Sequence, residues 1–171
     1  TSNSLTEILG DIGGGGAEIE SLTLDGNGVA ELGANVSTDG NTQTYVVPVT
    51  LTIDRVVLND SGANGIFFQS TVDSDGTPST LDITSAAAVS FDALVGSVSP
   101  LNELLINNGG TLTIQSDLQL DGQFNQTGTG ATDLSGSITT TDDPVSFASP
   151  LDLLAPELNE VLHKCGSTFG S

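Results

Sequence analysis

The sequence is almost devoid of positive charge. Only two of its 171 residues are basic, Arg55 and Lys164, against 22 acidic residues, and the formal net charge is -20. Contacts with phosphate need Lys and Arg, so the composition argues against a nucleic-acid partner. An anionic membrane surface would repel the chain for the same reason.

Residues that commonly carry chemistry are also scarce. The chain has one cysteine, one histidine, no methionine and no tryptophan. Cys165 therefore has no partner for an intrachain disulfide, and there is no Cys/His set for zinc. His163 and Cys165 are two residues apart, a spacing that would not bring them together on a helix, so a catalytic pair is not expected. No apolar run reaches the length of a membrane span.

The acidic excess does not indicate disorder, because apolar residues make up 36% of the chain. Its length suits one domain with a substantial core, and we expect residues 1–171 to form a single domain. No signal peptide opens the sequence, and Thr1 is not an initiator methionine. We therefore expect a mature or excised piece of a longer protein.

Short runs of alternating apolar residues dominate the chain. Each run is bounded by Gly, Asn, Asp or Pro, a pattern that predicts β-strands. The clearest runs span residues 21–24, 44–53, 55–59, 65–72, 79–84, 88–95, 103–106, 111–115 and 118–124. Helix-like patterns occur only at residues 4–9 and 156–164, the second of which opens with Pro156.

The chain also resembles itself at two different offsets. Leu22 matches Leu104 at an offset of 104 − 22 = 82, whereas Tyr45 matches Phe147 at an offset of 147 − 45 = 102. The difference, 102 − 82 = 20, is about one turn of a β-solenoid. Because each coil of a solenoid contacts only its neighbours, an extra turn is tolerated, and the offsets favour a parallel β-helix.

In such a fold, alternate strand residues point inward and stack on the coils above and below. Leu94 and the following residues are expected inside: Phe67, Leu81, Ile83, Phe91, Leu104, Ile106, Leu112, Ile114 and Phe147. Gly96 and residues 107–110 are expected at corners, where a positive φ is often needed.

Residues 88–114, AVSFDALVGSVSPLNELLINNGGTLTI, resemble the repeat of large bacterial surface proteins of the filamentous-haemagglutinin and autotransporter adhesin type. That repeat has a phenylalanine, a short G-A-V-G turn, a P-L pair, a strand and N-x-G-G-T-T. The corresponding positions are Phe91, Val95-Gly96, Pro100-Leu101, residues 104–106 and residues 108–111. Residues 42–73 resemble the companion segment with its T-Y-x-x-x-V-T-L motif.

The resemblance covers residues 10–154, whereas residues 155–171 are atypical. It implies an all-β fold, a right-handed parallel β-helix (β-solenoid), with short helical or irregular ends. It also implies export from a bacterial cell and an adhesive or scaffolding role at the surface. No catalytic residues are carried over with it.

Two chemical hypotheses remain open at this stage. Asp73 and Asp75 precede a glycine, as in the first half of a calcium loop, but the downstream glutamate of an EF-hand is missing, and plain turns explain them equally. Asp142 and Asp143, or the same first pair, could serve a polysaccharide-degrading enzyme. Acidic sugars, however, need basic residues to hold them.

The sequence as a whole predicts a non-enzymatic structural and adhesive module of an exported bacterial cell-surface protein. Its partner would be a protein or glycan receptor, without nucleic acid or membrane insertion, and calcium at Asp73 and Asp75 is the one cofactor considered. The main alternative is a subunit of an extracellular filament that joins copies through their end segments. An ice-binding protein and a polysaccharide-degrading β-helix are further alternatives.

Overall fold

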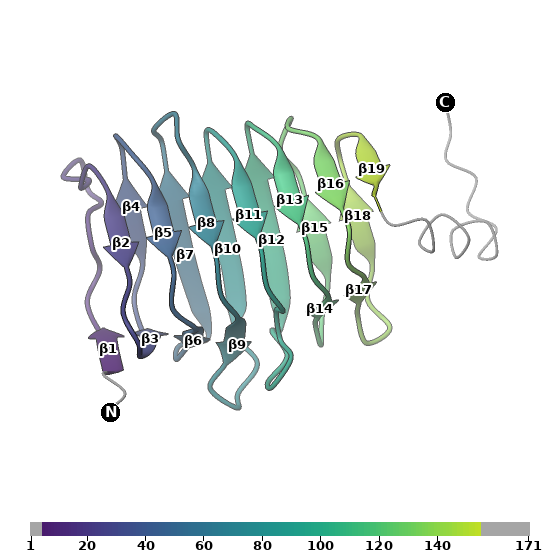
Figure 1. Ribbon diagram of the computed structural model, residues 1–171, viewed down its shortest axis with the longest axis horizontal. Helices are drawn as coiled ribbons and strands as arrows, with labels where there is room; N and C mark the ends of the chain where they lie inside the picture. Colours follow the sequence, from purple (N-terminus) through teal and green to yellow (C-terminus); the bar gives the residue numbers. More distant parts are fainter. Residues whose placement is uncertain (1–4, 155–171) are drawn as a thin grey trace.

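The computed structural model describes residues 5–154. Within these residues it contains nineteen β-strands and no helix, and all strand pairs are parallel. The strands stack into a β-solenoid of about six turns, drawn as an elongated coil in Figure 1. The predicted all-β fold, a parallel β-solenoid, is confirmed.

The coil has three faces, here called sheets A, B and C, and each turn visits them in that order. Sheet A contains β1 (Leu5–Ile8), β3 (Val29–Leu32), β6 (Val49–Leu51), β9 (Val72–Ser74), β14 (Leu118–Gln119) and β17 (Ile138–Thr139), with Val95 bridging β9 to β14. Sheet B contains β4 (Val36–Thr38), β7 (Arg55–Asp60), β10 (Thr80–Ser85), β12 (Glu103–Asn108), β15 (Phe124–Gln126) and β18 (Val145–Phe147). Sheet C contains β2 (Leu22–Leu24), β5 (Gln43–Tyr45), β8 (Ile66–Phe68), β11 (Val89–Phe91), β13 (Leu112–Ile114), β16 (Thr132–Leu134) and β19 (Leu151–Leu153).

The register gives the length of each coil. On sheet C, Gln43 pairs with Ile66, Ile66 with Val89 and Val89 with Leu112, so three successive coils have 66 − 43 = 89 − 66 = 112 − 89 = 23 residues. The next coil has 132 − 112 = 20 residues and the last has 151 − 132 = 19. The coils therefore shorten along the chain, because their corners lose residues while the strands remain.

The core is a set of inward stacks in which equivalent residues of successive coils lie over one another. On sheet B, Val56, Leu81, Leu104 and Phe124 are register partners, and all four are fully buried. Seven of the predicted inward residues are buried as expected: Leu81, Ile83, Phe91, Leu104, Ile106, Leu112 and Ile114. Alternation of apolar residues is therefore sufficient to identify most of the interior.

Three inward predictions are wrong or only partly right. Phe68, not Phe67, points inward and stacks on the next coil's Phe91 at 5.0 Å, because two consecutive phenylalanines fit either phase of the alternation. Leu94 is 41% exposed, and Val95 takes the inward position. Phe147 is only partly buried, since β18 is the outermost strand of sheet B among the described residues.

The predicted ends and repeat offsets also need correction. Residues 5–8, expected to be helical, form β1 because they pair in register with β3. The expected helix at 156–164 and the atypical segment 155–171 lie outside the described residues. Leu22 lies on sheet C and Leu104 on sheet B, so the offset of 82 matches different faces.

The second offset has the same error, because Tyr45 lies on sheet C and Phe147 on sheet B. All three faces carry the same alternation of apolar and polar residues, so a sequence match cannot tell one face from another. The difference of 20 between the offsets is therefore not an inserted turn.

Candidate functional site

Sheet B offers the widest outward face of the solenoid. Its three central strands β7, β10 and β12 have six residues each, against three in most other strands, and they pair in register over their full length. Alternation directs one row of side chains outward at the start of these strands and another near their end. The starting row is Arg55, Thr80 and Glu103, and the ending row is Asn59, Thr84 and Asn107.

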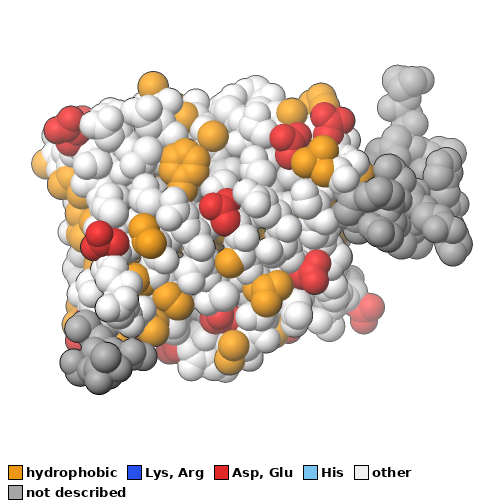
Figure 2. Space-filling model, in the orientation of Figure 1, with side chains coloured by type: hydrophobic (Ala, Val, Ile, Leu, Met, Phe, Trp, Pro, Cys, Tyr) orange, Lys and Arg blue, Asp and Glu red, His pale blue; other side chains and the backbone are white. Residues whose placement is uncertain are grey.

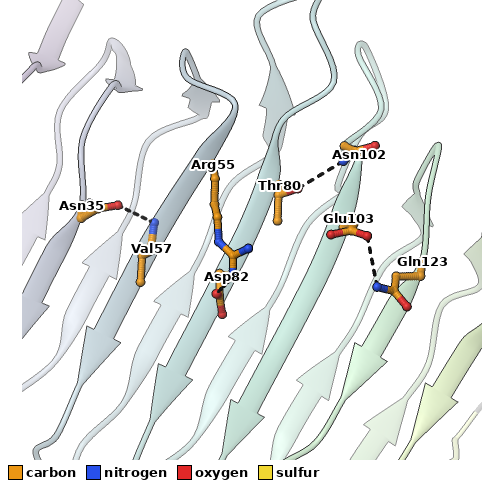
Figure 3. A network of polar contacts seen from close by, with 8 residues as sticks. All are labelled: Asn35, Arg55, Val57, Thr80, Asp82, Asn102, Glu103 and Gln123. Atoms are coloured by element: carbon orange, nitrogen blue, oxygen red, sulfur yellow. Dashed lines mark hydrogen bonds and ion pairs between the residues drawn. The ribbon is translucent and has the colours of Figure 1, made fainter.

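The starting row is bonded to neighbouring side chains, as Figure 3 shows. Arg55 forms an ion pair with Asp82 of the next coil. The hydroxyl of Thr80 accepts a hydrogen bond from Asn102 at 3.2 Å, and Glu103 accepts one from Gln123 at 3.1 Å. These polar groups already have protein partners, so a ligand would have to compete with them.

The ending row differs, because its three side chains form no hydrogen bond with any described residue. Thr84 and Asn107 are exposed and Asn59 is half-buried. Together with Ser61 and Thr129 they line a shallow groove of about 330 Å³ at the corner between sheets B and C. The groove thus presents amide and hydroxyl groups that are free to bond to something outside the chain.

A buried polar cluster lies directly behind this groove. Asp60 follows Asn59, points inward and is fully buried. One of its carboxylate oxygens accepts hydrogen bonds from the Thr38 hydroxyl (3.0 Å) and the Gly62 N–H (3.2 Å), and the other from the Gly65 N–H (3.0 Å) and, more weakly, the Ser85 hydroxyl (3.4 Å). Four donors therefore hold the buried carboxylate and fix the corner.

The next coils continue this cluster with amides. Asn108, which is buried, donates to the Gly110 carbonyl at 2.6 Å and accepts from Gln126 at 2.7 Å. At Gly109 a Cβ atom would lie only 2.2 Å from the Ala86 carbonyl oxygen, so this corner needs glycine for close approach of the coils. The groove is consequently displayed on a well-bonded backbone, and glycine keeps part of its lining free of side chains.

Asp73 and Asp75, the predicted calcium ligands, lie in β9 and just after it. Asp73 accepts hydrogen bonds from the backbone N–H groups of Val98 (2.8 Å) and Ser99 (3.2 Å) in the next coil. Asp75 accepts one from the Thr77 N–H at 3.1 Å within its own turn. Both carboxylates therefore have structural roles at loops, and the calcium hypothesis remains a prediction.

The other candidate groups do not converge on a centre. No group of three or more His, Cys, Asp or Glu side chains is placed to hold a metal ion between residues 5 and 154. Asp142 and Asp143 lie in an exposed turn, where the Asp143 carbonyl accepts a hydrogen bond from Thr140 at 2.6 Å. His163 and Cys165 lie outside the described residues.

Comparison with known proteins adds no identity. No family model, curated protein or solved structure matches the chain. The resemblance to bacterial adhesin repeats therefore remains a prediction. Over residues 5–154 the structure contains no helix that could cross a bilayer.

The groove was not foreseen from the sequence, although a signal for it exists. Asn59-Asp60, Thr84-Ser85 and Asn107-Asn108 are polar pairs that each close a six-residue strand. We expected residues 107–110 to form a corner, but Asn107 and Asn108 belong to β12 and the turn follows them. In each pair the first residue faces outward and the second inward, which becomes evident only when the coils are aligned.

Proposed function

We propose that the chain is a non-enzymatic structural and adhesive β-solenoid module of an exported bacterial cell-surface protein. The observation that carries the proposal is the ending row of sheet B, where side chains without protein partners line a groove across three successive coils. A rigid stack that repeats such groups along its axis suits contact with an extended partner.

The residues around the groove support binding more than chemistry. Asn, Ser and Thr supply hydrogen-bond donors and acceptors, whereas acid–base catalysis needs an accessible group that titrates near the working pH. Asp60 is the carboxylate among the lining residues, and it is fully buried with both oxygens occupied. We therefore assign recognition, and no reaction, to this surface.

The bacterial and exported parts of the proposal have separate support. They rest on the resemblance of residues 10–154 to adhesin repeats and on a composition rich in Asp, Ser, Thr and Gly with two basic residues. Immunogold labelling of intact cells that encode the chain tests this part. Label at the cell surface is expected, and label confined to the cytoplasm would contradict it.

Adhesion itself is tested with fluorescent beads that carry the full chain. The beads are washed over surfaces coated with polysaccharides, matrix proteins or whole host cells, beside beads that carry an unrelated acidic protein of similar charge. We expect retention of the solenoid beads on at least one surface. Equal retention of the two kinds of bead on every surface would remove the adhesive role.

A filament subunit is the second candidate. In its favour, the last described coil leaves apolar side chains accessible: Val145 is 43% exposed and Leu154 is 58% exposed. Against it, that coil also carries Asp142, Asp143 and Asp152, so contact with another acidic copy would be opposed at low salt. Light scattering that rises with both protein and salt concentration would favour the filament, and a constant monomer mass would oppose it.

A further inference from the structure

We propose that the groove along the ending row of sheet B binds an uncharged, hydroxyl-rich polymer, that is, a neutral polysaccharide that runs from coil to coil. This inference rests on the proposed adhesive function and names the chemistry of its receptor. It combines three features of the groove: the type of its side chains, their regular spacing and the absence of accessible charge among its lining residues.

The first feature is chemical complementarity. The amides of Asn59 and Asn107 and the hydroxyls of Ser61, Thr84 and Thr129 can each donate and accept hydrogen bonds. Sugar hydroxyls have the same dual capacity, so either direction of each bond is available. None of these five side chains is hydrogen-bonded to another described residue, so binding would replace water without breaking a protein bond.

The second feature is repetition. Asn59 is the register partner of Thr84, and Thr84 is the register partner of Asn107. Neighbouring strands lie about 4.8 Å apart, so equivalent polar groups recur at that interval along the solenoid axis. A ligand made of repeating units can meet these groups in succession, and a shallow groove lets such a chain pass through without enclosing its ends.

The third feature is charge. Arg55 is the one basic residue between residues 5 and 154, and it is already paired with Asp82. An acidic polysaccharide would therefore meet a net charge of -20 with no free cation at the groove.

A basic polymer would be drawn to exposed carboxylates on other faces instead. Sheet C, which lies in front in Figures 1 and 2, carries scattered carboxylates and places Asp133 and Asp152 side by side as register partners. The groove's own carboxylate, Asp60, is buried. An uncharged ligand is thus the one that the groove favours.

The test is a titration of the isotope-labelled full chain with neutral hexasaccharides, followed by NMR of backbone and side-chain amides. The probes are cellohexaose, maltohexaose, chitohexaose and mannohexaose, with polygalacturonate and decalysine as acidic and basic comparisons. We expect at least one neutral probe to shift the side-chain amide signals of Asn59 and Asn107 in a saturable way. Shifts that are absent with all four neutral probes, or that occur at the groove only with a charged polymer, would overturn the proposal.

Variants then assign the binding to the groove. The double variant Asn59→Ala/Asn107→Ala should weaken the best probe at least about tenfold, because it removes two amides that bond to the ligand. Gln123→Ala, on the bonded starting row, is the matched control and should bind as the parent does. Melting curves of both variants check that the fold is retained, and equal affinity of the double variant and the parent would overturn the assignment.

Failure of this inference can be told from failure of the adhesive function. Beads that adhere equally well with and without the double variant would show that adhesion uses another surface, which overturns the groove proposal alone. Beads that adhere to nothing, while a neutral hexasaccharide still binds at Asn59 and Asn107, would remove adhesion and leave the groove as a glycan site.

Discussion

The two ends of the same three strands on sheet B behave differently. At the start, Arg55, Glu103 and Asn102 are bonded to side chains of neighbouring coils. Near the end, Asn59 and Asn107 have no hydrogen bond to the described chain and line a groove. The comparison teaches that a polar surface is not by itself a binding surface. What matters is whether its groups already satisfy one another.

A second contrast lies between the outside and the inside of the same corner. Asn59 faces water, whereas Asp60 beside it is buried and accepts hydrogen bonds from four donors. The buried carboxylate stabilises the corner, and the outward amide is left free. One polar pair therefore combines a structural residue with a candidate binding residue, and the predictions below separate the two roles.

The largest effect is expected from the core that supports both rows. Leu104→Ala should lower the free energy of unfolding by ~2–5 kcal/mol, because Leu104 is fully buried between Leu81 and Phe124. Leu105→Ala is the matched control, since Leu105 faces outward on the same strand and should cost clearly less. Urea denaturation measures both, and an equal cost for the two variants would contradict the inward register.

The next effect compares a buried and an exposed carboxylate. Asp60→Ala should cost ~2–4 kcal/mol, because each buried donor left without an acceptor costs roughly 1–3 kcal/mol and water can enter part of the corner. Asp82→Ala should cost only ~0–1 kcal/mol, because its ion pair with Arg55 lies at the surface. If the two substitutions were equally harmful in urea denaturation, the corner would not depend on the bonds to Asp60.

A smaller effect concerns pH and the interior of sheet C. Burial raises the pKa of Tyr45 well above its ordinary value of 10, and its hydroxyl donates to Gln43 at 3.0 Å. The unfolded chain therefore releases this proton first as the pH rises. Stability should fall above pH ~10 by about 1.4 kcal/mol per pH unit. The parent and Tyr45→Phe are compared by urea denaturation at several pH values, and parallel curves above pH ~10 would show that Tyr45 is accessible to water.

How much the sequence could predict follows from these residues. Alternation with a period of two identifies Leu104 and Ile106 as inward, because burial depends on that period alone. It could not place Phe67 and Phe68, where two apolar residues in succession fit both phases. It also matched Leu22 to Leu104 across different faces, since every face has the same pattern.

The groove was beyond such reasoning for a different cause. Whether Asn102 or Asn107 is free depends on which residues of the adjacent coils lie beside it. That neighbourhood is set by coil lengths that vary from 23 to 19 residues, as the pairings of Ile66 with Val89 and Thr132 with Leu151 show. Polar residue types were visible in the sequence, but their partners were not.

The smallest expected effect bears directly on the two rows. Asn102→Ala should cost ~0.5–1.5 kcal/mol because it removes the hydrogen bond to Thr80, whereas Asn107→Ala should change stability by less than ~0.5 kcal/mol. Both are single Asn-to-Ala changes on β12 or next to it, so thermal denaturation compares them under the same conditions. A larger cost for Asn107→Ala would mean that the ending row is bonded after all.

The difference between the rows is tested most directly by NMR measurement of proton exchange between water and side-chain amides. The full chain contains both kinds of amide, so each serves as a reference for the other in one sample. We predict that the amide protons of Asn59 and Asn107 exchange with water at the rate of a free amide, and that those of Asn102 and Gln123 exchange more slowly. Slow exchange at Asn107, equal to that at Asn102, would contradict the account, because the ending row would then have no free groups to offer a ligand.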